Sequence, residues 1–147
     1  MPLQFVTGDP LLDEAPILAI DHNRKGRQEL EPLHMALMQK YPAAFSVYKR
    51  QCRKERINAG QYWLWQESRP KLLFLPVRDS AFGATRLRYV QAVAMQIARN
   101  YRLEGLKSLA IAPLGRPHER DEINKVLAMW LQRLPIDVII YTEYTAE

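Results

Sequence analysis

The chain has 147 residues, with 21 Lys and Arg against 16 Asp and Glu, so its formal net charge is +5. This length predicts one domain, residues 1–147, that can bury a core without disulfides or a structural metal. The single cysteine, Cys52, excludes an internal disulfide and any metal site built from several cysteines. No charged-then-apolar leader and no apolar run near 18 residues is present, so we expect a cytoplasmic protein with no membrane span.

The first part of the chain reads as two strands followed by two helices. Residues 3–7 (LQFVT) have a strand pattern and run into Gly8-Asp9-Pro10, which forms a turn by composition. Residues 17–21 (ILAID) are apolar but too short for a helix, so they predict a buried strand. Helices are predicted over residues 30–40 and 43–54, separated at Pro42.

The remaining elements continue this alternation. Residues 62–66 (YWLWQ) and 71–76 (KLLFLP) predict a hairpin or meander, with one tryptophan buried and the other on the opposite face. The later elements are helices over 85–101 and 121–134 and strands over 108–112 and 137–142. The whole pattern predicts an α/β fold, a mixed and largely parallel sheet with helices on both faces.

The stretch SLAIAPLGRPHER, from Ser108 to Arg120, is the first place to look for function. A short apolar strand runs into a loop that Gly and Pro break and that carries several charges, and a helical pattern follows. In open α/β sheets ligands bind at the carboxyl ends of strands, because the N–H groups of the next loop and helix point there. We therefore expect a ligand site at this edge of the sheet.

Short motifs along nearly the whole chain resemble the macrodomains. They are FVTGDPLL, His22-Asn23 followed by Gly26, Tyr41-Pro42, FLPVRD, GLKSLAIAPLG and IIYTEY, in that order. The resemblance is strongest to the branch with the DNA-targeting antitoxin macrodomains and the terminal ADP-ribose-protein glycohydrolases. It implies a three-layer macrodomain-like fold that binds ADP-ribose or a related adenine nucleotide at the C-terminal edge of its sheet.

The same resemblance implies roles for four residues of this chain, and it adds Gly8 to the ligand-binding candidates. Asp9, directly after Gly8, stands where the family reads the exocyclic amine of adenine, although it equally suits a turn that caps the next segment. Asn23 matches the residue that holds the distal ribose, and Gly26 matches the first glycine of that loop. Tyr141 resembles the aromatic residue that lies against adenine, with packing under the C-terminal tail as the alternative.

The loop after Gly26 departs from the family pattern. Arg27-Gln28-Glu29-Leu30-Glu31 stands in place of a Met-Gly-x-Gly-like stretch whose bare backbone lets ribose and phosphate approach. Long polar side chains at these positions are expected to fill or reshape the distal-ribose pocket. The alternative is a plain solvated loop.

The loop after the strand over 108–112 departs in the same way. Gly115 is kept, but Arg116, Pro117, His118 and Glu119 follow, and Pro117 removes one backbone donor. Arg116 is a candidate phosphate ligand in compensation, as is Arg120, and we include Gly115 and His118 among the ligand-binding candidates. In the alternative interpretation this is an exposed capping loop, with Glu119 favourably placed at a helix N-terminus.

Arg78 stands where the related glycohydrolases have a nucleophilic lysine. A guanidinium stays protonated and delocalised and is a very poor nucleophile, so we expect hydrolysis by that route to be absent. Arg78 remains a candidate ligand contact, and Glu119 is a weak candidate for an acidic catalytic residue. The three histidines fall on separate elements and lack ligand spacing, so neither a metal nor a cofactor is predicted.

Four basic residues lie on or at the exit of the second predicted helix: Lys49, Arg50, Arg53 and Lys54. They form either a solvated helix face or a contact for nucleic-acid phosphates. The competing hypothesis to ADP-ribose binding is accordingly a filled pocket on an interaction module that binds protein or nucleic acid. A hydrolase with altered catalytic residues is the third hypothesis.

Overall fold

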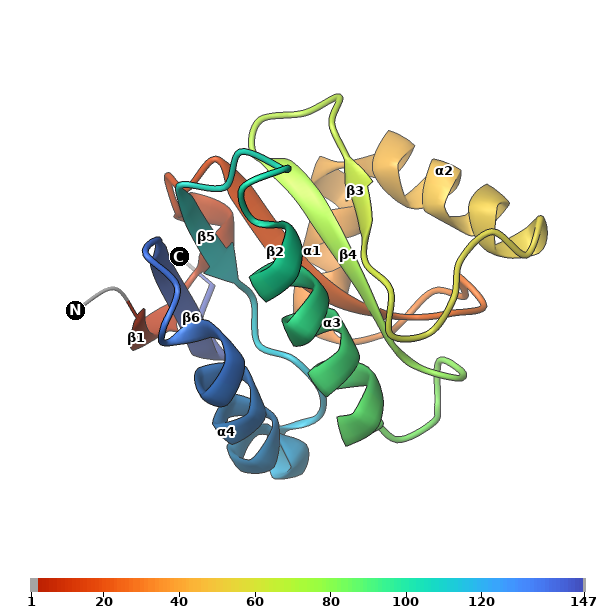
Figure 1. The fold of residues 1–147 in the computed structure, drawn as a ribbon. Coiled ribbons are helices and arrows are strands. Elements are labelled where there is room, and N and C mark those ends of the chain that lie inside the picture. Colours follow the sequence, from red (N-terminus) through yellow and green to blue (C-terminus); the bar gives the residue numbers. More distant parts are fainter. Residues whose placement is uncertain (1–2, 147) are drawn as a thin grey trace.

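The computed structural model describes residues 3–146, which form one six-stranded sheet in the order β1-β6-β5-β2-β4-β3 (Figure 1). The strands are β1 (Leu3–Gly8), β2 (Ile17–Asn23), β3 (Trp63–Trp65), β4 (Lys71–Arg78), β5 (Ser108–Ile111) and β6 (Asp137–Tyr144). Neighbouring strands are parallel, except that β3 pairs with β4 in the antiparallel direction. The carboxyl ends of β2, β4, β5 and β6 therefore meet at one edge of the sheet.

Helices cover both faces of the sheet. They are α1 (Pro32–Lys40), α2 (Pro42–Arg53), α3 (Leu87–Asn100) and α4 (Arg120–Leu131). In Figure 1, α3 and α4 lie in front of the sheet, and α1 and α2 lie behind it. Each helix pair packs its apolar stripe on its own hydrophobic cluster. The predicted three-layer α/β fold, with a mixed and largely parallel sheet, is confirmed.

The two central strands lack polar alternation because both of their faces are buried. In β2, Ile17 and Ala19 face the α3/α4 cluster, whereas Leu18 and Ile20 face the α1/α2 cluster. Strand β4 divides its leucines and Phe74 between the two clusters in the same way. A parallel strand that is buried on both faces has a continuous apolar sequence. For this reason the runs ILAID and KLLFLP predict β2 and β4.

Apart from shifts of one to three residues in the bounds of the helices and of the other strands, the structure differs from the predicted elements in two respects. Strands β2, β4 and β6 extend past the predicted ends, to Asn23, Arg78 and Tyr144, and so carry polar residues onto the edge of the sheet. The expectation that the two tryptophans lie on opposite faces is wrong. Trp63 and Trp65 are half-buried on the α1/α2 side with ring centroids 6.2 Å apart, since residues two apart in a strand share a face.

Candidate functional site

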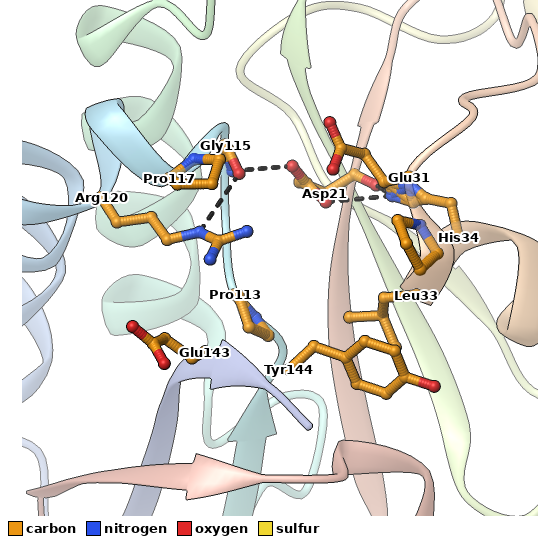
Figure 2. Close-up of a pocket in the computed structure, with 11 residues that line it drawn as sticks. Asp21, Glu31, Leu33, His34, Pro113, Gly115, Pro117, Arg120, Glu143 and Tyr144 are labelled. Carbon is orange, nitrogen blue, oxygen red and sulfur yellow. Dashed lines mark hydrogen bonds and ion pairs between the residues drawn. The ribbon is translucent and has the colours of Figure 1, made fainter. Parts of the chain in front are cut away.

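A cavity of about 280 Å³ opens at the carboxyl edge of the sheet, between α1, β6 and the loop after β5 (Figure 2). Apolar groups of Leu33, Pro113 and Tyr144 form one wall. The polar lining includes Asp21, Glu31, His34, Gly115, Arg120 and Glu143. This is the edge at which the sequence predicts a ligand, and the volume lies just below the range of about 300–1,000 Å³ of small-molecule pockets.

A buried ion-pair network lies beside the cavity and centres on Arg78, the last residue of β4. The Arg78 side chain is fully buried, and its Nη1 donates to Asp21 Oδ2 at 2.7 Å and to Thr85 Oγ1 at 3.0 Å. Its Nε and Nη2 both donate to Glu29 Oε2, at 3.1 Å and 2.9 Å. The guanidinium is thus held from three sides by protein groups.

The opposite charges in this network offset the energetic cost of burying each of them. Burial opposes ionisation of Arg78, but the carboxylates of Asp21 and Glu29 outweigh it and raise the pKa of Arg78 above its ordinary value. Burial likewise disfavours the Asp21 carboxylate, yet Arg78, His34 and the N–H of Gly115 together lower the pKa of Asp21. Both groups are therefore charged at neutral pH, and Arg78 cannot supply a neutral nucleophile.

Arg116 ties together the three loops that follow β2, β4 and β5. Its Nη1 donates to Glu29 Oε1 at 3.1 Å and to Glu31 Oε1 at 3.3 Å, both in the loop after β2. Its Nη2 donates to the carbonyl oxygen of Ala81 at 2.7 Å, in the loop after β4. Glu29 is only 3% exposed, so a buried carboxylate bridges Arg78 and Arg116 at the centre of the edge.

Asn23 is fully buried and organises the loop after β2. Its Oδ1 accepts the N–H groups of Lys25 and Arg27, at 3.1 Å and 3.2 Å. Its Nδ2 donates to the carbonyl oxygen of Arg27 at 2.9 Å and to Glu29 Oε2 at 3.0 Å. These contacts use both donors and the oxygen of the amide. The predicted contact of Asn23 with ribose stays a prediction. In this structure the Asn23 side chain stabilises the conformation of the loop after β2.

The two loop glycines, Gly26 and Gly115, have positive φ angles of 71° and 76°. A Cβ on Gly26 would lie 3.0 Å from both Lys49 Cα and Cys52 Sγ, so the loop after β2 packs tightly on α2. The N–H of Gly115 donates to Asp21 Oδ2 at 2.8 Å, on the rim of the cavity. Glycine is required at both positions for backbone conformation and close packing.

Replacing Gly115 by alanine is expected to reduce the free energy of unfolding by about 2–4 kcal/mol. The new Cβ would lie 2.6 Å from Ile123 Cδ1 and 2.9 Å from Glu119 Oε1. Gly105→Ala is the matched control, because Gly105 also has a positive φ, of 68°, but a Cβ added there would meet no atom within 4 Å. Urea unfolding should show a clearly larger loss for Gly115→Ala, and equal losses would contradict the packing argument.

Glu119 and His118 lie in the short 3-10 helix Pro117–Glu119 after the loop. The Glu119 carboxylate accepts the N–H of Thr85 at 3.0 Å and the N–H of Arg116 at 2.7 Å. Burial opposes ionisation, but these backbone donors lower the pKa of Glu119, so it is an ionised acceptor rather than an acid. The His118 side chain is exposed and does not line the cavity.

Gly8 ends β1, Asp9 follows it, and Tyr141 lies on the neighbouring strand β6, and none of the three lines the cavity. Asp9 caps the 3-10 helix Pro10–Leu12, its Oδ1 accepting the N–H of Leu11 at 2.9 Å. Tyr141 donates to Asp13 Oδ2 at 2.6 Å, and its ring lies 3.7 Å from a Cβ built on Gly8. The predicted roles of these residues toward adenine stay predictions.

Sequence reasoning missed the acidic partners of Arg78. Asp21 ends the apolar run ILAID, and a charge at the end of a buried strand is the one signal that could have identified it. Glu29 stands out in the sequence only as one of several long polar residues in its loop. Arg120 is a candidate phosphate ligand by sequence, and its side chain lines the cavity.

Two observations concern other kinds of site. Within residues 3–146 no group of His, Cys, Asp and Glu side chains is arranged to hold a metal ion. In the same part of the chain, none of the helices combines the length and the apolar character that crossing a membrane requires.

Known structures identify the class of fold: the six-stranded sheet with helices on both faces is that of the macrodomains. The macrodomain of Mycobacterium tuberculosis DarG has a TM-score of 0.84 and 21% identity, covering 95% of this chain and 96% of that one. Thermosipho africanus DarTG, in complex with ADP-ribose, has a TM-score of 0.86 and 23% identity, covering 95% of this chain and 41% of that one. The resemblance to the antitoxin macrodomains is thus confirmed at the level of the fold.

Sequence comparison points to the same branch. The DNA ADP-ribosyl glycohydrolase of Mycobacterium tuberculosis is 24% identical over 110 residues, which cover 69% of this chain. The matched segment spans 31% of that relative, less than a third of its length. No protein-family model matches the sequence.

Proposed function

We propose that this protein binds ADP-ribose or a related adenine nucleotide in the cavity of Figure 2 without hydrolysing it. The proposal rests on one observation: in the cavity at the carboxyl edge of the sheet, an apolar wall faces the side chain of Arg120. Leu33 and Tyr144 offer apolar surface to a base. Arg120 Nε donates to the Gly115 carbonyl at 3.3 Å, while its Nη atoms bond to nothing within residues 3–146 and can take a phosphate.

The size of the cavity favours the adenine nucleotide half of such a ligand. The Arg78–Glu29–Arg116 contacts fill the adjoining space between the loops after β2 and β5 with protein. The macrodomain fold of Thermosipho africanus DarTG, which is in complex with ADP-ribose, supports this class of ligand. We expect AMP to bind within about tenfold of ADP-ribose, because the distal ribose adds few contacts.

Calorimetric titration with ADP-ribose and AMP tests the proposal. Arg120→Ala should weaken binding roughly 10- to 150-fold, the effect of losing a hydrogen bond to a charged group. Arg133→Ala, which removes an exposed charge that does not line the cavity, should leave binding unchanged. Asp9 does not line the cavity, and Asp9→Asn keeps the helix cap while removing the carboxylate, so a loss of affinity in this variant would mean that the ligand extends beyond the cavity to Asp9. If no heat of binding were measured at about millimolar ligand, the proposal would be wrong, and the hypothesis of a filled pocket on a module that binds protein or nucleic acid would be favoured.

The absence of hydrolysis is proposed from the environment of Arg78. Wild type should release no ADP-ribose from ADP-ribosylated DNA, since the guanidinium is charged and bonded to Asp21, Glu29 and Thr85. Arg78→Lys should also be inactive, because Asp21 and Glu29 would hold the lysine in its protonated form. Release by wild type that disappears in Glu119→Ala would overturn this part of the proposal.

A further inference from the structure

A groove of about 620 Å³, here called the basic groove, lies between the loop after β2, α2 and the loop after β4. Its lining includes Lys25, Arg27, Lys49, Arg53, Glu55 and Phe82. It shares no lining residue with the cavity of Figure 2. The groove is therefore a second concave surface, separate from the proposed nucleotide site.

The charge of the basic groove is strongly positive and is not neutralised by the protein. Lys49 and Arg53 lie one turn apart on α2, and both are exposed, as are Lys25 and Arg27 on the facing loop. None of these four side chains forms an ion pair with a carboxylate of residues 3–146, and Glu55 is the only acidic residue of the lining. Concentrated positive charge in a groove favours a polyanion. Arg50 and Lys54, also exposed, do not line it.

The two basic walls are fixed relative to each other. Gly26 packs its backbone against Lys49 Cα and Cys52 Sγ, so the loop cannot move away from α2 without breaking this contact. Asn23 holds the N–H groups of Lys25 and Arg27 with one side-chain oxygen. The positive groups thus sit on backbone that is ordered before any ligand arrives, which lowers the entropy lost on binding.

Phe82 presents an aromatic face beside these charges. Its side chain belongs to a residue that is 88% exposed, at the tip of the loop after β4. The preceding residue, Ala81, is buried, and Arg116 holds its carbonyl oxygen at 2.7 Å. A solvent-facing ring on backbone that is held at the preceding residue, next to a cationic groove, is the combination that binds unpaired bases and their phosphates.

We propose that the basic groove binds single-stranded nucleic acid, with its lysines and arginines on the phosphates and one base stacked on Phe82. This binding requires no ADP-ribose on the strand, and it does not depend on occupancy of the cavity. An acidic peptide would use the positive charge but would gain no stacking on the ring, whereas an anionic membrane would bury the ring in its interface. A dependence on Phe82 therefore indicates a nucleic-acid strand when anionic vesicles do not show the same dependence.

Fluorescence anisotropy with a labelled oligo-dT of about 12 nucleotides, at about 50 mM salt, tests this proposal on the full chain. Phe82→Ala should weaken binding roughly 5- to 150-fold, the range for losing one stacked base, and Phe82→Trp should retain it. Lys49→Gln/Arg53→Gln should reduce the slope of log K against log salt by about 1.4, two phosphate contacts on a single strand. Lys107→Gln/Arg133→Gln removes the same charge from exposed positions outside the groove and should change little.

Three results would overturn the proposal. The first is no change in anisotropy at about 100 μM protein. The second is an equal loss of salt dependence in Lys107→Gln/Arg133→Gln. The third is binding of polyglutamate or phosphatidylserine vesicles with the same dependence on Phe82. Titration of Phe82→Ala with ADP-ribose separates the two sites, because the cavity should be unaffected. Loss of nucleic-acid binding with intact ADP-ribose binding would support both proposals.

Discussion

Arg78→Ala is expected to lose about 3–5 kcal/mol of its free energy of unfolding, which urea denaturation followed by circular dichroism can measure. The substitution removes a fully buried guanidinium, which leaves Asp21 in the interior without an arginine and Glu29 with Arg116 alone. An uncompensated buried charge is far less stable than the pair, even where the pair itself adds little net stability.

The loss in Arg78→Ala should depend on pH in a direction set by Asp21. In wild type the pKa of Asp21 lies below its ordinary value of 3.8, because Arg78, His34 and the Gly115 N–H outweigh the effect of burial. A lowered folded-state pKa means that this carboxylate stabilises the fold above about pH 4, and that the contribution disappears as the pH falls through the folded value. Without Arg78, only His34 and the Gly115 N–H oppose the effect of burial on Asp21, so protonation of this carboxylate costs the variant less than it costs wild type. The difference in free energy of unfolding between wild type and Arg78→Ala should therefore become smaller at acidic pH.

Two comparisons make the Arg78 result interpretable. Arg24→Ala removes an exposed arginine that pairs with Asp79 at 2.9 Å, and such surface pairs contribute about 0–1 kcal/mol. Combining Arg78→Met with Asp21→Asn and Glu29→Gln removes all three charges and should recover part of the stability. If Arg78→Ala were no less stable than Arg24→Ala, the network would not be buried as the structure has it.

The fold could be predicted from the sequence because its central strands are apolar on both sides. ILAID and KLLFLP mark β2 and β4 by composition alone, and α3 shows its buried stripe of Val90, Val93, Ala94 and Ile97 at helical spacing. The strand ends were less predictable. The predicted strands end at Asp21 and Pro76, whereas backbone pairing between β2 and β4 continues to Asn23 and Arg78.

The sequence predicts where the site lies but not which side chains form it. The carboxyl edge follows from parallel strands, but the partners of Arg78 lie 57 and 49 residues away along the chain, at Asp21 and Glu29. Pairing at such separations is set by strand order and loop conformation, which no local pattern encodes. The same limit applies to the basic groove. The charges on α2 are visible in the sequence, but their apposition to Lys25 and Arg27 depends on how Gly26 docks on the helix.

The network gives a physical reason for the departures in both loops. Where the resembling family has bare glycines, this chain has Glu29 in one loop and Arg116 in the other, and the two side chains pair directly at 3.1 Å. Glu29 also satisfies Arg78 and accepts from Asn23. One buried carboxylate therefore joins the loops after β2 and β5 and the end of β4.

This role of Glu29 leads to a strong prediction for Glu29→Ala. The variant leaves donors of Arg78, Arg116 and Asn23 without their shared acceptor, and we expect a loss of about 3–5 kcal/mol and a fall in Tm of about 10–20 °C. The space left behind has the shape of a carboxylate and is lined by its donors. Acetate or formate should therefore bind there and restore part of the stability, by about 1.4 kcal/mol when the anion is tenfold above its Kd.

Thermal unfolding in acetate and in chloride at equal ionic strength measures this rescue. The difference in Tm between the two salts should be several degrees for Glu29→Ala and near zero for wild type, whose acceptor is in place. Glu31→Ala is the matched control, since Glu31 pairs with the same Arg116 Nη1 at 3.3 Å but is partly exposed, so its loss should cost less than about 1 kcal/mol and give no rescue. Equal responses to the two anions in Glu29→Ala would mean that water, rather than an empty anion site, fills the space. A loss below about 1 kcal/mol in Glu29→Ala would contradict the role of the buried carboxylate in holding the loops.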